Sequence, residues 1–244
     1  MELKDMIYRR KSTRSYTGKP VDEVTLQKIR VFAAHAKPLY EQLKVRSEIV
    51  NADSVRCILP WTTPQMVAVF SEEKDGAMEN VGFIYQQLDL YMQSLGLGVC
   101  WLGMGRLASG KEAVLKGEDD LKFVMLLAFG YPKGEAQRHD VSEFKRKSLA
   151  EISDKPDAAL EPARLAPSSV NSQPWYFTHE GDTVHLYCVQ QGILMKKQPS
   201  RLNRMDVGIA LAHLYVVDQN RFQFFKVDAP APVKGYSYIG SFKI

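Results

Sequence analysis

The sequence predicts an α+β protein, because two kinds of hydrophobic pattern occur along it. Apolar residues recur at helical spacing in ENVGFIYQQLDLYMQSLGLG (79–98), at Ile84, Leu88, Tyr91 and Leu95. Short apolar runs typical of buried strands lie on either side, at MVAVF (66–70) and LKFVMLLAFGY (121–131). In addition, strand-type and helix-type stretches follow one another in a similar order in the two parts of the chain.

The elements of the first part end where turn-forming residues occur. In order, they are a helix within 1–15, a turn at Gly18 and Pro20, a helix at 21–36, the strand at 66–70, the long helix at 79–98 and the strand at 121–131. Gly96 and Gly98 end the long helix, since glycine is common just after a helix C-terminus. The charged stretch 133–156 follows and is the best candidate for a boundary.

The second part repeats this order of elements. It has a short helix in LEPARL (160–165), a strand at TVHLYCV (183–189), a helix at RMDVGIALAHLYVV (204–217) and a strand at QFFKV (223–227). Aligning the long helices places Val81-Gly82 on Val207-Gly208 and Leu88 on Leu214. We interpret this as an internal duplication, with a first half at 1–150 and a second, shorter half at 151–244, interlocked with the first. The alternative is that two amphipathic helices resemble each other because each buries one face.

Composition narrows the class of protein. With 244 residues, 45% of them hydrophobic, the chain can bury a sizeable core. The net charge of +4 is too small and too dispersed to indicate a nucleic-acid partner. Cys57, Cys100 and Cys188 have no metal-like spacing and are expected to be reduced thiols. The charged N-terminal stretch lacks a signal peptide's apolar core, and no apolar run is long enough for a bilayer, so we expect a cytoplasmic protein.

The stretch RRKSTR (9–14) places four cations around one hydroxyl, that of Ser12. In an extended segment the alternating residues Arg10, Ser12 and Arg14 point to one side. Two guanidinium groups flanking a hydroxyl suit a phosphate, whose oxygens arginine binds in pairs. The alternative is a solvated basic run near a chain terminus.

Two further stretches have the composition of binding loops. In LGLGVCWLGMG (95–105), glycines allow a close approach to the backbone, although an ordinary helix end with a buried connection fits as well. In APSSVNSQPWYF (166–177), prolines stiffen the loop, and hydroxyl and amide groups both donate and accept hydrogen bonds. Such a loop matches the edge of a pyrimidine ring. Its alternative is a turn network that satisfies its own hydrogen bonds.

Together, RRKSTRSYTGKPV, LGLGVCWLG and APSSVNSQPWYF resemble the signature segments of the FMN-dependent nitroreductase family. The resemblance implies a mixed sheet surrounded by helices. In ordinary members the Pro-Ser-Ser-Asn loop soon follows the Arg-Ser-Arg segment and clamps the flavin of the partner chain. Here AAHAKPLYEQL (33–43) occupies that place, and the intact loop comes in the second half. The chain is thus similar to the branch of the family with two fused protomer-like halves.

The resemblance also implies which residues bind FMN. The residues that would hold its phosphate, ribityl chain and pyrimidine side are Arg10, Ser12 and Arg14, with Lys145 or Arg146 reaching the phosphate. The residues that would face flavin N5 are Gly103 and Met104. The clamp would consist of Pro167, Ser168, Ser169 and Asn171.

The function implied is that of an oxidoreductase which passes electrons from NAD(P)H through FMN to a nitroaromatic, quinone or similar acceptor. No catalytic side chain beyond the flavin is implied, apart from Arg14 as an electrostatic stabiliser, and no metal. The expected partners are these small molecules, without nucleic acid or membrane, and fused halves would allow a monomer to bind FMN. One alternative is a flavin store or sensor without efficient turnover, and another is a basic domain that binds no cofactor.

Overall fold

The computed structural model describes residues 2–56, 61, 63–115, 120–191, 199–228 and 230–243. The chain divides into two compact units, of which unit 1 comprises Met1–Ala77 and Gln87–Glu143. Unit 2 comprises Met78–Gln86 and Phe144–Ile244. The long helix α3 (Ala77–Ser94) is therefore shared, because its middle belongs to unit 2 and its ends to unit 1.

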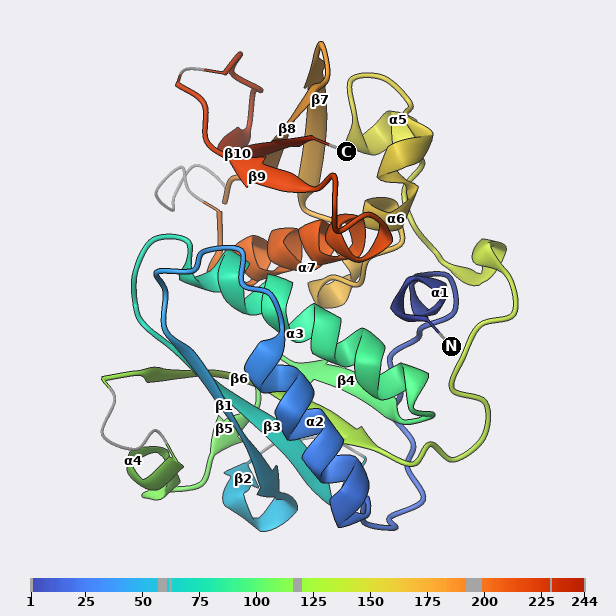
Figure 1. Ribbon diagram of the computed structural model, residues 1–244, viewed down its shortest axis with the longest axis vertical. Helices are drawn as coiled ribbons and strands as arrows, with labels where there is room; N and C mark the ends of the chain where they lie inside the picture. The colour runs from blue at the N-terminus through green and yellow to red at the C-terminus, as the bar shows by residue number, and fades with distance from the viewer. Residues whose placement is uncertain are drawn as a thin grey trace. The chain divides into compact units, whose positions relative to one another are not determined.

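Unit 1 is built on a four-stranded antiparallel sheet with the strand order β1-β3-β6-β4 (Figure 1). Its strands are β1 (Val45–Asn51), β3 (Gln65–Ser71), β4 (Gly98–Leu102) and β6 (Lys122–Gly130). A small second sheet pairs β2 (Val55–Arg56) with β5 (Arg106–Leu107). The helices of this unit, besides the ends of α3, are α1 (Leu3–Ile7), α2 (Glu23–His35) and α4 (Lys111–Leu115).

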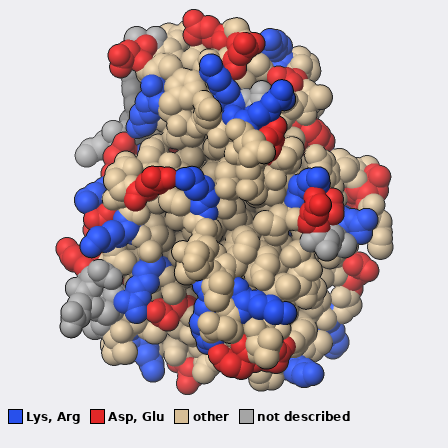
Figure 2. Space-filling view, in the orientation of Figure 1, with Lys and Arg blue, Asp and Glu red and all other residues tan. Residues whose placement is uncertain are grey.

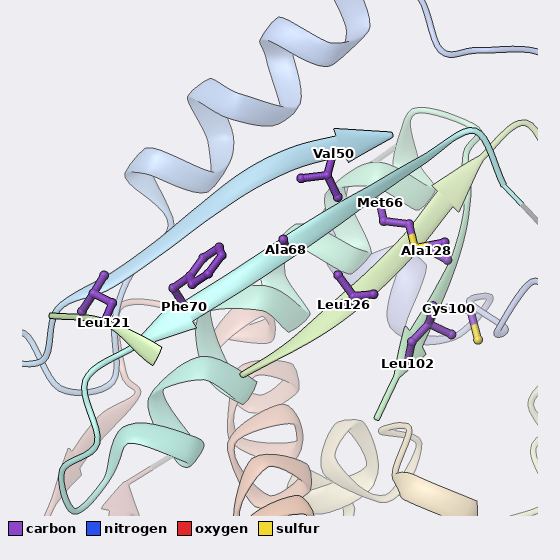
Figure 3. Packing of buried hydrophobic residues seen from close by; sticks show 9 residues of the cluster. All are labelled: Val50, Met66, Ala68, Phe70, Cys100, Leu102, Leu121, Leu126 and Ala128. Atoms are coloured by element: carbon purple, nitrogen blue, oxygen red, sulfur yellow. The ribbon is translucent and has the colours of Figure 1, made fainter. Parts of the chain in front are cut away.

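The core of unit 1 lies on both faces of this sheet. Every residue of β3 is buried, which explains why its sequence is a continuous apolar run rather than an alternating one. On one face, Ala68 and Phe70 of β3 pack with Leu126 and Ala128 of β6 (Figure 3). Since side chains alternate along a strand, the residues between them point to the opposite face.

Unit 2 contains a second four-stranded antiparallel sheet, with the order β7-β8-β10-β9. Its strands are β7 (Trp175–Glu180), β8 (Thr183–Val189), β9 (Gln223–Phe225) and β10 (Tyr236–Lys243). Its helices, besides the middle of α3, are α5 (Leu149–Ile152), α6 (Glu161–Arg164) and α7 (Arg201–Val217). The hydroxyl of Ser200 begins α7 by accepting a hydrogen bond from the Asn203 backbone N–H.

The two sheets are connected in the same way. In unit 1, β1 pairs with β3, β3 leads to α3, and the edge strand β4 precedes β6, which lies between β3 and β4. In unit 2, β7, β8, α7, β9 and β10 follow the same scheme. This common order supports an internal duplication, which remains a proposal, as do the halves 1–150 and 151–244.

Two glycines allow α3 and α7 to approach closely within unit 2. A Cβ atom on Gly82 would overlap the carbonyl oxygen of Met205, and one on Gly208 would overlap that of Glu79. Glu79 and Met205 each lie three residues before a glycine, so the contact is reciprocal. The glycines that the sequence aligns therefore both lie where the backbones of these helices approach each other closely.

The α+β class predicted from the sequence is confirmed. Within the sheets the strands are antiparallel, and isolated bridges between Ser12 and Val99 and between Ser153 and Phe177 run parallel. None of the helices in the described ranges is long and apolar enough to cross a membrane. Cys100 and Cys188 are buried and form no disulfide, whereas Cys57 lies outside the described residues. On the face shown in Figure 2, positive and negative side chains are interspersed.

Candidate functional site

The Arg-Ser-Arg segment of unit 1 lies along strand β4. Ser12 forms a parallel bridge with Val99, and the backbone N–H of Thr13 donates to the Val99 carbonyl at 2.9 Å. The contact needs glycine at position 98, because a Cβ there would overlap the side chain of Thr13. Strand β4 ends at Leu102, and an exposed turn at Gly103 and Met104 follows. The structure thus brings the first two predicted stretches together along one strand.

Arg10 and Arg14 have different environments. The Arg10 side chain is only 1% exposed, and its Nε lies 3.5 Å from Oδ1 of the fully buried Asp89. Asp89 also accepts hydrogen bonds from Trp101 Nε1 at 2.9 Å and from Gln93. Arg14, by contrast, is exposed, and Ser12 is half-buried. Sequence reasoning missed Asp89, although a carboxylate within an apolar helix is a signal that could have revealed it.

The guanidinium groups of Arg10 and Arg138 lie close to each other beside this segment. Arg138 donates to the backbone carbonyl of Arg10, and burial together with the neighbouring Arg10 charge lowers the pKa of the Arg138 guanidinium. Arg10 Nε is buried and has no hydrogen-bond partner among the described residues, although it lies near Asp89. Crowded guanidinium groups with an unsatisfied donor fit a bound anion such as the phosphate of FMN.

The Pro-Ser-Ser-Asn loop of unit 2 contains three non-glycine residues in left-handed conformations. These are Val170, Asn171 and Gln173, with φ values of 47°, 58° and 48°. Left-handed backbone is especially unfavourable for a β-branched residue such as Val170, whose side chain is 95% exposed. Backbone strain of this kind persists only where the surroundings impose it, and it is concentrated at functional sites.

Hydrogen bonds inside unit 2 impose this conformation. Ser168 Oγ accepts from the Gln173 backbone N–H at 2.9 Å, and Gln173 Oε1 accepts from that of Lys147 at 2.7 Å. Asn171 Nδ2 donates to the Lys145 carbonyl at 2.7 Å, and Arg146 Nη1 donates to Asn171 Oδ1 at 2.5 Å. The structure therefore brings Lys145 and Arg146 to the loop.

These bonds decide which polar groups of the loop remain for a ligand. Ser168 and Asn171 have protein partners, as expected for the alternative of a self-satisfied turn network. The hydroxyl of Ser169 has no hydrogen-bond partner within the described part of the chain, and Ser169 is half-buried. Ser169 is thus the loop residue best able to offer a hydrogen bond to a bound molecule.

Asp206 of α7 is a further residue that sequence reasoning missed. Its two carboxylate oxygens accept the backbone N–H of Ser169, each at 3.0 Å. Burial raises the pKa of Asp206 to about 7, although the bond from Ser169 lowers it. The signal in the sequence was again a carboxylate in an apolar helix.

A serine, a histidine and a glutamate also meet in unit 2, although none was predicted to do so. Ser241 Oγ lies 2.8 Å from His185 Nδ1, and His185 Nε2 lies 3.0 Å from Glu180 Oε2. Ser241 is fully buried in β10, so that no substrate can reach its hydroxyl. These bonds link neighbouring strands and do not constitute a hydrolytic site.

Substituting Val170 tests the backbone strain in the loop. We expect Val170→Asn to raise the free energy of unfolding by about 1 kcal/mol, because asparagine adopts the left-handed conformation more readily than valine. Urea unfolding measures the change. Val31→Asn, the same replacement at an exposed position of helix α2, is the control and should give no gain. Equal effects of the two substitutions would contradict the assignment of strain to Val170.

The chain is thus an α+β protein with two four-stranded antiparallel sheets and a two-stranded one, a cationic segment along β4 and a strained loop before β7. A family model described as "Putative TM nitroreductase" matches residues 2–217. The chain therefore belongs to this nitroreductase family, which confirms the resemblance seen in the sequence.

Among solved structures, one shares the fold over nearly the whole chain. A protein described as a putative nitroreductase from Thermotoga maritima has a TM-score of 0.66 and 17% identity, over 99% of this chain and 92% of that chain. A nitroreductase family protein from Clostridium difficile 630 has a TM-score of 0.48 and 17% identity, over 62% of this chain and 96% of that one. An FMN-dependent nitroreductase from Clostridium difficile R20291 has a TM-score of 0.43 and 17% identity, over 59% of this chain and 92% of that one. No curated protein matches the sequence.

Proposed function

We propose that the protein is a flavin-dependent oxidoreductase that binds FMN and passes electrons from NAD(P)H to a nitroaromatic, quinone or similar acceptor. The observation that carries this proposal is the pair of neighbouring guanidinium groups, Arg10 and Arg138, beside the segment that lies along β4, in a chain that belongs to a nitroreductase family. An anionic cofactor would relieve the repulsion between Arg10 and Arg138. We also propose that the protein acts in the cytoplasm.

When bound, FMN would supply the redox chemistry, accepting a hydride and releasing electrons. The chain supplies binding, orientation and charge. Arg10 and Ser12 would hold the phosphate and ribityl chain, and exposed Arg14 would offer its cation to the pyrimidine side, where negative charge accumulates on reduction. The turn at Gly103 and Met104 would face the reactive edge of the ring.

The proposal assigns the loop of unit 2 to the same flavin. The residues that would clamp it are Pro167, Ser168, Ser169 and Asn171, with Lys145 and Arg146 beside them. Asn171 and Arg146 bind each other, so Arg146 would orient the loop in addition to reaching toward the phosphate. Ser169 would donate or accept a hydrogen bond at the flavin edge.

An absorbance spectrum tests the function. The purified protein should show the visible band of oxidised flavin, and NADH or NADPH added without oxygen should bleach it. An added quinone or nitroaromatic should then restore the band over repeated cycles. If NADH and NADPH bleach the band of the protein no faster than they bleach free FMN, the alternative of a flavin store or sensor is favoured.

Arg14→Ala is expected to weaken FMN binding about 10- to 150-fold, because it removes a charge-assisted hydrogen bond worth about 1.5–3 kcal/mol. Fluorescence titration with FMN measures the change. Arg9→Ala, which removes the same charge from a neighbouring exposed residue outside the predicted set, is the control. Equal losses in the two variants would show that only the overall charge matters. Arg10→Ala is a poorer test, since it would also leave Asp89 buried without its cation.

A further inference from the structure

Hydrogen bonds hold the strained loop of unit 2 at several points. One bond joins Ser168 to Gln173 within the loop, and others join Asn171 to the segment at Lys145 and Arg146. None of these bonds involves the backbone N–H of Ser169, the residue whose hydroxyl remains for a ligand. That N–H donates to Asp206, which lies on the long helix α7.

The acceptor of the Ser169 N–H, Asp206, is a buried carboxylate. It is 4% exposed, and no cation pairs with it among the described residues. Arg204, on the same helix, pairs with Glu79 at 2.6 Å. A buried carboxylate without a cation is unfavourable, because it loses its hydration. The sequence repeat aligns Asp206 with Asn80, whose amide oxygen is an acceptor that carries no charge.

We propose that Asp206 is a positioning residue, which holds the Ser169 backbone through its carboxylate so that the loop presents the Ser169 hydroxyl to the flavin. The proposal rests on the proposed function and extends it to a residue that does not itself touch the flavin. An ionised carboxylate holds an N–H more strongly than a neutral one, since the hydrogen bond is charge-assisted. The charge of Asp206 thus determines how firmly the loop is held.

The charge of the Asp206 carboxyl group is expected to change near neutral pH, because the group is buried. Burial raises the pKa of Asp206 to about 7. The groups that face this region are the Cys188 thiol from β8 and Glu79 from α3, and burial, Glu79 and Asp206 together raise the pKa of that thiol, which therefore stays neutral. Arg204 is paired with Glu79, and Arg164 of α6 with Glu161.

The sign of the expected pH effect follows from this pKa. Between the unfolded value near 4 and the folded value of about 7, the folded chain binds more protons than the unfolded chain, so this group's contribution to stability falls as pH rises. Over the same range the carboxylate ionises and its bond to Ser169 strengthens. A rise in pH through 7 should therefore favour flavin binding while it lowers stability.

The test is the FMN dissociation constant from about pH 6 to about pH 8, on either side of the pKa. The phosphate of FMN titrates in the same range, so the measured quantity is the difference between the wild type and Asp206→Asn. We expect affinity to rise several-fold more with pH in the wild type than in Asp206→Asn. Asp206→Ala should bind FMN about tenfold more weakly than the wild type at the higher pH. Identical pH profiles for wild type and Asp206→Asn would overturn the proposal.

Amide hydrogen exchange provides a readout that does not depend on flavin. In Asp206→Asn and Asp206→Ala, the Ser169 amide should exchange faster than in the wild type, while amides of β7 and β8 keep their protection. If no form of the protein binds FMN but Ser169 responds in this way, the proposed function fails and the anchoring role stands. Unchanged exchange at Ser169 in Asp206→Asn, the variant more certain to fold, would overturn the anchoring role itself.

Discussion

Gly208→Ala is expected to lower the free energy of unfolding by about 3 kcal/mol, because the new methyl group would overlap the Glu79 carbonyl and force two helices apart. Alanine normally stabilises a helix relative to glycine, so the sign alone is informative. The urea midpoint measures the effect. Val217→Ala, at an exposed position on the same helix, is the control and should be close to neutral.

Gly82→Ala should have a similar effect, because its methyl group would overlap the Met205 carbonyl on the other side of the same crossing. Once one methyl group has separated the helices, the second should cost less, so the double variant should lose less than the sum of the single losses. A Gly208→Ala protein as stable as the wild type would show that the helices do not approach as the structure has them.

The second large effect is expected at Asp89. Asp89→Ala should cost about 3–5 kcal/mol, since it leaves Arg10 buried without its carboxylate and removes the acceptor of Trp101 Nε1. Asp89→Asn should cost less, because its amide oxygen still accepts a hydrogen bond. Urea unfolding of the variants measures both losses.

A double variant separates the ion pair from the rest of the site. Asp89→Leu combined with Arg10→Met replaces both charges by apolar groups and should be more stable than either single variant. If the loss of unfolding free energy in the double variant equals the sum of the losses in the two single variants, the side chains do not interact. Flavin titration of the same proteins then shows whether Arg10 is also needed for binding.

Long periodic segments made the fold class predictable from the sequence. The helix in 79–98 and the strands at 66–70 and 183–189 correspond to α3, β3 and β8 of the structure. Strand β4 was interpreted as a loop, because Gly98 was attributed to a turn, whereas it allows the close approach of Thr13. Strand β1 was missed since its sequence, VRSEIVN, has no continuous apolar run.

The candidate site was predictable in its segments but not in its contacts. The prolines, serines and asparagine of 166–177 indicated a stiff polar loop. No local rule places a valine in the left-handed region, so the conformation of Val170 depends on tertiary hydrogen bonds. Asp89 and Asp206 escaped notice for a related reason: the helical pattern shows which face is buried, but not that a carboxylate on it has a partner.

We propose that one chain binds one flavin, because the signature segments of one site are divided between the two proposed halves. The Arg-Ser-Arg segment belongs to the first half and the Pro-Ser-Ser-Asn loop to the second. A complementary site would use Leu39 and Tyr40 in place of two serines. Flavin edges left unpaired there would each cost about 1–3 kcal/mol.

The most direct test is to measure the flavin released on denaturation, relative to the protein concentration. The mass of the native protein in solution then shows whether the flavin was bound by a monomer. We expect one FMN per chain, retained by a monomer. Two FMN per chain would contradict the single composite site, and a protein that retains no flavin even when saturated with FMN would contradict the function itself.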